Sequence, residues 1–440
     1  MKSISVQAQS ESDDISSSTR ALPVTPRPVM GNWAIAATVT GNAIEFFDFL
    51  TYSFYAVYIG RAFFPTHNDF FSLLLSLATF GVGFVTRPLG AFLIGAFADR
   101  AGRRPALMVT ISLMTVGTMG VALTPSYASI GLSAPIILVI ARLVQGLALG
   151  GEVGPSTALL LEAAPLNRRG AYVSWQGASQ GMASLVAGLT GLSLALILDE
   201  RQLAAWGWRI PFLFGLLIIP VGLYIRRRLP ETLEAPKEKK EIGAVRLIWR
   251  HHRPALWLGL AIVMCQTISA YVNSYMTTYA LTALGMSSSK SMMATVVLGI
   301  ATIAGAKLGG RLSDRFGRKP LMIVPRVVLA LAVYPAFLFL IHARTELALA
   351  SVTATLTLLT AMGTAASMVA LVEIFPNAVR SSGMAITNAV SVSLFGGTTQ
   401  FVIAWLIGTT GSSLSPAYYV IASSIIGIWA MYKLPETRNT

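Results

Sequence analysis

Long apolar stretches, separated by short polar loops, fill most of the chain. A run of about 20 apolar residues is long enough to cross the hydrocarbon core of a bilayer as a helix. Twelve such spans can be drawn, at residues 33–59, 70–97, 106–124, 134–162, 171–198, 208–228, 254–282, 290–311, 320–342, 347–374, 382–408 and 414–434. The pattern predicts an all-α membrane protein with 12 transmembrane helices.

The composition and the placement of charge support this topology. Charged residues make up 12% of the 440 positions, whereas soluble domains carry about 25%. With the N-terminus in the cytoplasm, most of the 33 lysines and arginines fall on the cytoplasmic side, and the opposite side holds Arg61, Arg201, Arg209, Lys290 and Arg344. This bias predicts that both termini lie in the cytoplasm. The net charge of +14 is therefore a topology signal with lipid headgroups as partners, and nucleic acid is not expected.

The residues that bind metals and cofactors are sparse. The single cysteine, Cys265, lies within an apolar span, so no internal disulfide can form. All four histidines fall in predicted loops or at helix ends, which leaves no buried metal or haem site. We expect no cofactor and no enzyme activity. A polytopic enzyme or receptor remains a remote alternative.

Two short loop segments are repeated half a chain apart. Gly, Asp, Arg, Gly and Arg occupy the same slots in residues 95–104 and 310–319, and the last slot is basic in both. Each segment joins two apolar spans, so the repeat predicts two related halves of six helices. The expected parts are a disordered cytoplasmic tail (1–29), an N-terminal bundle (30–228), a cytoplasmic linker (229–253), a C-terminal bundle (254–434) and a short tail (435–440).

Several charged and amide side chains fall inside the spans, where an ionisable group costs about 2.5–3.5 kcal/mol on insertion scales and is a functional candidate by default. The first span places Asn42, Glu45, Asp48 and Tyr52 on one helical stripe. Arg87, on the second span, lies at a similar depth. The candidates on later spans are Arg142, Gln145, Glu152, Gln176, Gln180 and Asn388.

This set suits an anionic solute and a proton. The planar fork of an arginine matches a carboxylate, so we predict that Arg87 and Arg142 bind substrate charge while Tyr52 and the amides orient the solute. Burial in a low dielectric favours the protonated carboxyl group. The proton-coupling candidates are Glu45, Asp48 and Glu152. The alternative is that the arginines neutralise these carboxylates and simply hold the helices together.

The repeated loops, Gly-x-x-x-Asp-Arg-x-Gly-Arg-Arg/Lys, resemble the signature loop of the major facilitator superfamily. The resemblance implies two pseudo-symmetric six-helix bundles that work by alternating access. It also implies that the loop aspartates face the starts of spans eleven and five, and that basic loop residues pair with acids at the ends of spans four and ten. The gate residues implied are Asp99, Arg103, Arg104, Glu162, Asp314, Arg318 and Glu373. A solvated turn carrying positive-inside charge is the alternative.

Further motifs are similar to the metabolite–proton symporter branch of that superfamily. They are Gly41-Asn42-x-x-Glu45-x-x-Asp48-Phe49, Arg87-Pro88-Leu89-Gly90, Arg142-Leu-x-Gln145-Gly146 and residues 206–212. Residues 63–65 and 174–180 most resemble citrate–proton symporters. The resemblance implies proton-coupled symport of a small carboxylate, citrate or another tricarboxylate. A dicarboxylate, monocarboxylate or zwitterion, or carboxylate exchange, is the alternative, and the protein is expected to work as a monomer.

Four charges do not fit these roles directly. We expect Glu162 and Glu373 to be interfacial and Arg326 to be a headgroup anchor. Lys307 is expected to snorkel along its helix towards the headgroups, with a substrate contact as the alternative. Lys307 and Arg326 also depart from the citrate carriers, in which uncharged residues are expected at these two positions.

Overall fold

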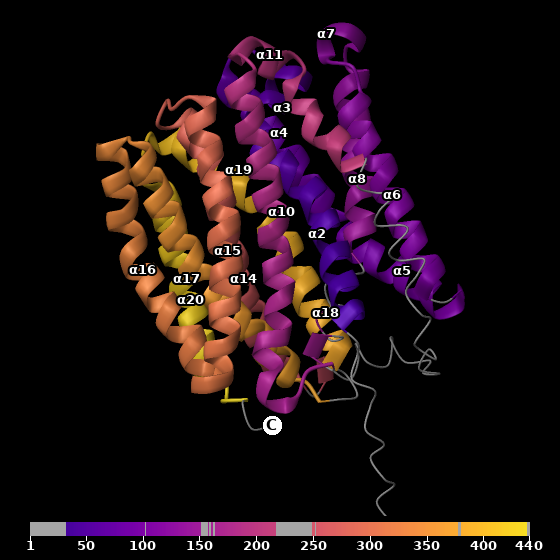
Figure 1. Ribbon diagram of the computed structural model, residues 1–440, viewed down its shortest axis with the longest axis vertical. Coiled ribbons are helices and arrows are strands. Elements are labelled where there is room, and N and C mark those ends of the chain that lie inside the picture. The colour runs from indigo at the N-terminus through magenta and orange to yellow at the C-terminus, as the bar shows by residue number, and fades with distance from the viewer. Residues whose placement is uncertain are drawn as a thin grey trace, which may run out of the picture.

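The computed structural model describes residues 32–101, 103–150, 157, 160–161, 163–216, 249–250, 252–376 and 380–437. Within these ranges the chain forms helices and turns and contains no strand. Seven helical segments of the described chain are long and apolar enough to cross a membrane. The expected all-α membrane fold is confirmed (Figure 1).

The first half of the chain supplies the helices of one bundle. They are α2 (Asn32–Phe54), α3 (Ala56–Phe63), α4 (Asp69–Val85), α5 (Arg87–Ala101), α6 (Arg103–Leu123), α7 (Tyr127–Ile130), α8 (Ser133–Leu149), η1 (Leu166–Arg168), α10 (Arg169–Ile197), α11 (Glu200–Ala205) and η2 (Gly207–Arg209). The sixth span continues as helix through residue 216, and its remainder lies outside the described residues.

The second half supplies the other bundle. Its helices are α14 (Arg253–Thr282), α15 (Ser288–Phe316), α16 (Arg318–Ala343), α17 (Glu346–Glu373), α18 (Arg380–Ser391), η3 (Val392–Gly396), α19 (Gly397–Thr410) and α20 (Ser415–Lys433). The tail 1–29 and most of the linker 229–253 lie outside the described residues, so those boundaries stay predictions.

Among the described residues, the first, second and eleventh predicted spans are interrupted. The first breaks at Tyr55, and the eleventh contains the π-helical turn η3. The second breaks at Thr86, because Pro88 has no N–H to donate to the carbonyl of Phe84 and its ring crowds the preceding turn. The Thr86 hydroxyl instead donates to the Leu143 carbonyl of α8 at 2.8 Å, which ties the break to the neighbouring helix.

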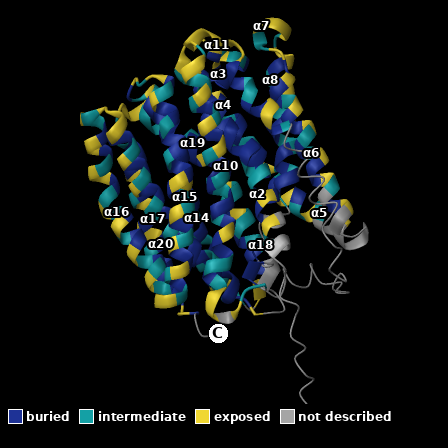
Figure 2. Cartoon of the chain, viewed as in Figure 1, coloured by how far each residue is buried: buried dark blue, intermediate teal, exposed yellow. Residues whose placement is uncertain are grey.

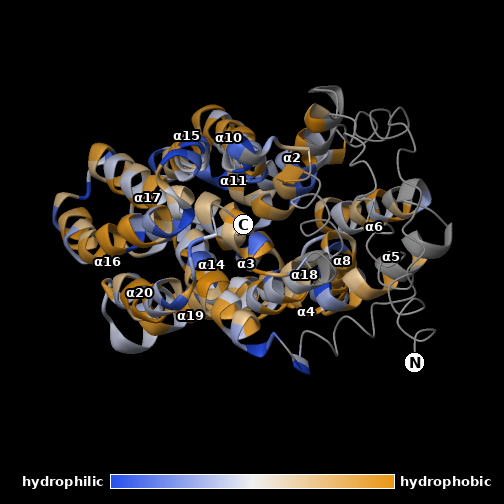
Figure 3. Ribbon diagram, turned by 90° about the horizontal axis from the view of Figure 1, so that it is seen from below, coloured by the Kyte–Doolittle hydropathy of each residue, from blue (hydrophilic) through white to orange (hydrophobic). Residues whose placement is uncertain are grey.

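Two pairs of helices make most of the contact between the two bundles. Seen from below, α10 lies beside α15 at one edge of the interface, and α4 lies beside α19 at the other (Figure 3). Small residues allow both contacts, because a Cβ on Gly170 would lie 2.3 Å from the Gly310 carbonyl oxygen, and one on Gly81 would lie 2.6 Å from that of Gly397. Exposed residues lie along outer helices such as α16 (Figure 2). They include large apolar side chains such as Leu331, which is 73% exposed, as lipid contact requires.

Glycine is also required where α8 crosses α4. A Cβ on Gly146 would lie 1.8 Å from the Gly83 carbonyl oxygen and 2.3 Å from the Thr86 hydroxyl. We expect Gly146→Ala to push the helices apart at a cost of about 1–3 kcal/mol, measured as a lower midpoint of thermal unfolding in detergent. Gly363→Ala is the matched control, because its nearest atom would be 3.8 Å away. Equal midpoints for the two variants would contradict the packing argument.

Candidate functional site

The predicted stripe on α2 faces the interior of its bundle. Asp48 is buried, and its Oδ2 atom accepts a hydrogen bond from Gln145 Nε2 at 2.7 Å and another from the Thr118 hydroxyl. Gln145 Oε1 in turn accepts from Arg142 Nη1 at 2.6 Å. One glutamine therefore links the arginine of α8 to the carboxylate of α2, and Asp48 Oδ1 has no hydrogen-bond partner.

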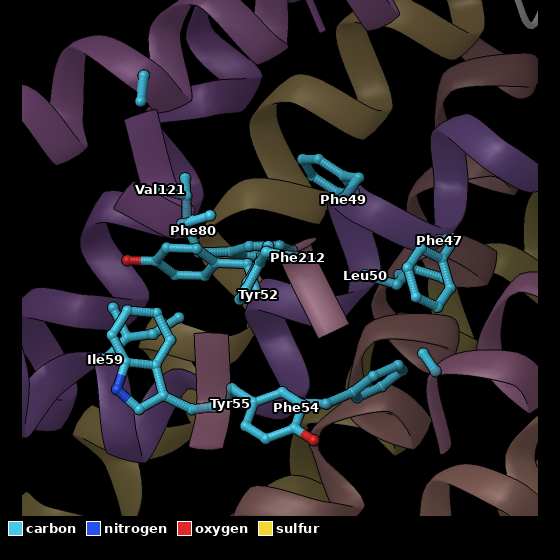
Figure 4. Packing of buried hydrophobic residues seen from close by; sticks show 14 of the residues in the cluster. Phe47, Phe49, Leu50, Tyr52, Phe54, Tyr55, Ile59, Phe80, Val121 and Phe212 are labelled. Carbon is cyan, nitrogen blue, oxygen red and sulfur yellow. The ribbon is translucent and has the colours of Figure 1, made fainter. Parts of the chain in front are cut away.

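Both predicted arginines lie against aromatic rings. The Arg142 guanidinium lies 4.5 Å from the centre of the Tyr52 ring and 4.7 Å from that of Phe49. The Arg87 guanidinium lies 4.1 Å from the Phe84 ring and 4.4 Å from the same Phe49 ring. Figure 4 shows Phe49 and Tyr52 within the buried aromatic cluster of this bundle. Cation–π contacts of this kind stabilise a buried guanidinium without using its N–H groups.

Donor atoms of both guanidinium groups are left without partners. Nε and Nη2 of Arg87 and of Arg142 are buried and make no hydrogen bond. In the described structure no carboxylate lies within salt-bridge distance of either group. A buried charged donor without a partner is costly. Aromatic rings therefore cover the faces of the two guanidinium groups while donors at their edges are unpaired, which is the arrangement that an anion-binding centre requires.

Amides join α2 to α10 beside this centre. Asn42 Nδ2 donates to the Ser179 hydroxyl at 2.5 Å, and its Oδ1 accepts from Gln176 Nε2 at 3.1 Å. Gln176 and Gln180 border a cavity of about 150 Å³ between the two bundles. The C-terminal bundle contributes polar groups to the same cavity, among them Asn273, whose Nδ2 donates to the Thr360 hydroxyl.

The sequence did not single out Tyr271 of α14, which connects the cavity to the arginines. Its side chain borders the cavity and contacts Arg87, and its ring lies 5.6 Å from that of Phe84. Arg87 and Arg142 themselves lie behind this tyrosine and are not among the described residues that border the cavity.

The other predicted residues are placed as follows. Glu45 is buried on α2, and Asn388 is half-buried on α18 and is not among the described residues of the cavity wall. Glu152 and Glu162 lie outside the described residues, as do the side chains of Asp99, Arg103 and Arg104.

Arg326 corrects an expectation. It is 2% exposed, and Nη1 donates to the Ser269 hydroxyl at 2.6 Å and to the Cys265 carbonyl at 3.3 Å, both on α14. The headgroup assignment was wrong because Arg326 points from α16 into its own bundle, away from lipid.

Charged groups join the bundles at the inner end. Asp314, in the last turn of α15, accepts from the backbone N–H of Gly170 at 2.8 Å and of Ala171 at 2.9 Å, in the first turn of α10. Arg318 Nη1 donates to Asp314 Oδ1 at 2.7 Å. The carboxylate thus meets a helix start, where the helix dipole favours an anion.

Glu373 is the centre of the adjoining contacts. Arg169 Nη1 lies 3.1 Å from Oε1 and Arg318 Nε lies 3.5 Å from Oε2, which also accepts from the Thr437 hydroxyl at 2.8 Å. The residue is 7% exposed, so the interfacial placement was wrong. Two arginines, one from each half of the chain, allow this carboxylate to be buried.

A matching contact at the outer end was not predicted. The Ser288 hydroxyl, in the first turn of α15, donates to Glu200 Oε1 of α11 at 2.5 Å, and the Ser288 N–H donates to the same oxygen at 3.3 Å. The Tyr58 hydroxyl is hydrogen-bonded to Ser288. A second cavity, of about 470 Å³, lies at this end and is bordered by all three residues.

Two bundles of apolar helices that enclose a cavity with several polar side chains in its wall, with charged contacts at both ends, define a multi-pass membrane transport protein. Residues 38–399 match the Major Facilitator Superfamily, and the chain belongs to that family. It is a transporter and not an enzyme.

Relatives and solved structures agree with this assignment. The chain is 37% identical over 401 residues to a citrate-proton symporter of Klebsiella pneumoniae, with 90% of each chain covered. It is 32% identical over 402 residues to an alpha-ketoglutarate permease of Escherichia coli, covering 90% of this chain and 91% of the relative. A glycine betaine/proline/ectoine/pipecolic acid transporter of Dickeya dadantii is 33% identical over 423 residues, covering 92% and 83%. The crystal structure of a D-xylose-proton symporter superimposes with a TM-score of 0.74 at 19% identity, covering 92% and 98%. These likenesses confirm the fold of two pseudo-symmetric six-helix bundles.

Proposed function

We propose that the protein is a proton-coupled symporter of a small carboxylate, citrate or another tricarboxylate. The observation that carries this proposal is the pair of buried guanidinium groups, Arg87 and Arg142, whose Nε and Nη2 atoms have no partner. The names of the relatives that are 36–37% identical, both citrate-proton symporters, support the same solute. The membrane proposed is the bacterial inner membrane, with both termini cytoplasmic and a monomer as the working unit.

The arginine pair favours an acid with more than one carboxylate. The guanidinium groups of Arg87 and Arg142 both lie against the Phe49 ring and present two sets of hydrogen-bond donors. A bidentate arginine–carboxylate pair is among the strongest hydrogen-bonded contacts in proteins. The cavity amides Gln176 and Gln180 would orient hydroxyl and carboxyl oxygens. The solute reaches the arginines when Tyr271 moves aside.

Coupling follows from the shared glutamine. Gln145 bonds both Arg142 and Asp48, so an anion that draws the Arg142 fork away also changes the contacts of the carboxylate. In this scheme Asp48 carries the coupled proton, and its Oδ1, which has no hydrogen-bond partner, is the atom that receives it. Asp48 then binds its proton when the arginine pair binds the anion, and both are released together.

A dicarboxylate or a zwitterion is the second candidate. The relatives at 32–33% identity carry alpha-ketoglutarate permease and betaine or proline transporter in their names. A zwitterion carries one carboxylate and a cation, and the arginine pair offers the cation no partner.

Uptake into proteoliposomes tests the proposal. Labelled citrate is measured with and without an inward proton gradient, and is competed with tricarballylate, succinate, α-ketoglutarate and betaine. We expect uptake that the gradient stimulates and that tricarboxylates alone inhibit. Uptake of labelled succinate or betaine in place of citrate would support transport activity but would refute a tricarboxylate as the substrate. Citrate uptake that ignores the gradient would discard the proton coupling.

We further propose that the contacts at the two ends of the α10–α15 pair are alternating latches. The helices are antiparallel, and at each end a carboxylate at or just past the end of one helix meets the start of the other. Asp314, in the last turn of α15, meets the start of α10 at the inner end, and Glu200, just past the end of α10, meets the start of α15 at the outer end. Rocking of the bundles has to break one latch at a time, as alternating access requires.

Neutral substitutions of the two latch carboxylates should shift the equilibrium between inner opening and outer opening in opposite directions. A hydrogen bond to a charged group contributes about 1.5–3 kcal/mol, so we expect Asp314→Asn to favour inner opening, and Glu200→Gln outer opening, by about tenfold or more. The readout is the labelling rate of Thr364→Cys in the central cavity and of Leu281→Cys in the outer cavity by a hydrophilic maleimide, in a Cys265→Ala background.

An exposed acid at the outer end provides the control. Glu346 lies 3.2 Å from Lys290, and both belong to the C-terminal bundle, so Glu346→Gln should leave both labelling rates unchanged. Shifts in the same direction for the two latch variants would refute the alternating arrangement.

A further inference from the structure

Lys307 lies on the membrane-facing side of the α10–α15 interface. Its Nζ is 2.9 Å from the centre of the Trp175 ring of α10, and that tryptophan is 39% exposed. The residues of α15 that border the central cavity, such as Thr302 and Ala306, point elsewhere, because consecutive residues of a helix differ in direction by about 100°. Ile300 and Leu308, on the membrane side of α15, are 54% and 49% exposed.

Lys307 begins a basic stripe. Arg311 and Arg315 follow at intervals of four residues, so all three lie on one side of α15, and both arginines are exposed. Arg311 acts on Lys307 as a like charge. Among the described residues, no ion pair joins Lys307 or Arg311 to a carboxylate. The stripe is therefore an uncompensated positive surface on the lipid-facing side of the protein.

The basic stripe spans the boundary between the headgroups and the hydrocarbon core of the inner leaflet. α15 ends at Phe316, so Arg311 lies about 7 Å and Lys307 about 13 Å from the cytoplasmic end of the helix. The headgroup region occupies about 5–7 Å on each side of the hydrocarbon core. Arg311 thus lies at the boundary, and Lys307 lies one turn inside it, where a cation needs either an anion or a route to the headgroups.

We propose that this surface binds the headgroup phosphate of an anionic phospholipid, with Lys307 and Arg311 on the phosphate and the Trp175 ring against the glycerol and upper acyl chains. Tryptophan is suited to this level of the bilayer, because its ring has both an apolar body and a polar N–H. The lipid would touch both bundles, α10 through Trp175 and α15 through the basic stripe. It would lie close to the Asp314 latch and favour the closed inner end.

Lipid titration of the full-length protein in detergent, followed by native mass spectrometry, tests this site. We expect dioleoyl phosphatidylglycerol to bind more tightly than dioleoyl phosphatidylcholine. A basic residue at an anionic lipid surface contributes about fivefold in affinity, so Lys307→Gln and Arg311→Gln should each weaken phosphatidylglycerol binding by about that factor. Lys307→Arg should retain it, which keeps the test valid if the glutamine variant does not fold.

Lys433→Gln is the matched control, because Lys433 is an exposed lysine at the end of α20. Three results would overturn the site. They are equal affinity for the two lipids, an equal loss in the Lys433→Gln variant, and displacement of the lipid by millimolar inorganic phosphate, which would indicate a site for free anions. None of these readouts depends on the transported solute, so the lipid site and the proposed function can fail separately.

Discussion

Replacing Arg142 with glutamine is expected to lower citrate uptake by about 100-fold or more. Truncating one partner of a buried, hydrogen-bonded charge pair costs about 2–5 kcal/mol, and each 1.4 kcal/mol is tenfold. The substitution removes two free donors, Nε and Nη2, and also the Nη1 bond to Gln145. The measurement is initial uptake per folded protein in proteoliposomes, at a fixed proton gradient.

Arg326→Gln separates a solute contact from the stability of a bundle. Arg326 is equally buried, lies in the other half and bonds Ser269 and the Cys265 carbonyl. We expect this variant to lower the midpoint of thermal unfolding while its folded fraction transports normally. If Arg142→Gln lowers uptake of a neutral analogue as much as it lowers uptake of citrate, Arg142 has a structural role and the anion-binding centre is refuted.

Sequence periodicity was sufficient for much of the architecture. A stripe at intervals of three and four residues places Asn42 and Asp48 on one side of α2, and both are buried in the structure. The repeated loop likewise implied a place for Asp314 at the start of α10, where its carboxylate is found. These are properties of one helix or of a family motif, and they do not depend on how the helices are rotated against each other.

Rotation and tertiary distance account for what the sequence missed. Arg326 lies in an apolar stretch of α16, and nothing in its flanking residues distinguishes the interior of a bundle from the lipid side. The outer latch depends on the position of the short helix α11 over the start of α15, so Glu200 and Ser288, far apart in sequence, meet through the fold alone. Asp199, which caps α11, was the local signal that a helix begins there.

The placement of the arginines also required the structure. The sequence indicated that Arg87 and Arg142 share a depth with the acids, and this left open whether they neutralise them. In the structure Gln145 stands between Arg142 and Asp48, and aromatic rings cover both guanidinium groups. A direct ion pair would favour a role of the arginines in holding the helices together. Guanidinium donors without partners, beside a glutamine, favour a role in binding an anion.

Asp48→Asn is expected to abolish accumulation driven by a proton gradient while citrate exchange continues. Asparagine has the same shape, and its oxygen can still accept from Gln145 and Thr118. Its amide resembles a permanently protonated carboxyl group and releases no proton. A gradient of one pH unit supplies about 1.4 kcal/mol per proton, which corresponds to about tenfold accumulation of citrate. The variant should show no accumulation driven by this gradient.

Two assays on the same proteoliposomes distinguish coupling from folding. Counterflow, in which unlabelled citrate inside the vesicles exchanges for labelled citrate outside, needs solute binding and alternating access but no net proton movement. We expect Asp48→Asn to retain counterflow within a few-fold of the unmodified protein. Asp69→Asn, at an exposed acid paired with Arg61, should keep both counterflow and gradient-driven accumulation. If Asp48→Asn still accumulates citrate against its gradient, the coupled proton is carried elsewhere, and the link through Gln145 serves the packing of the bundle instead.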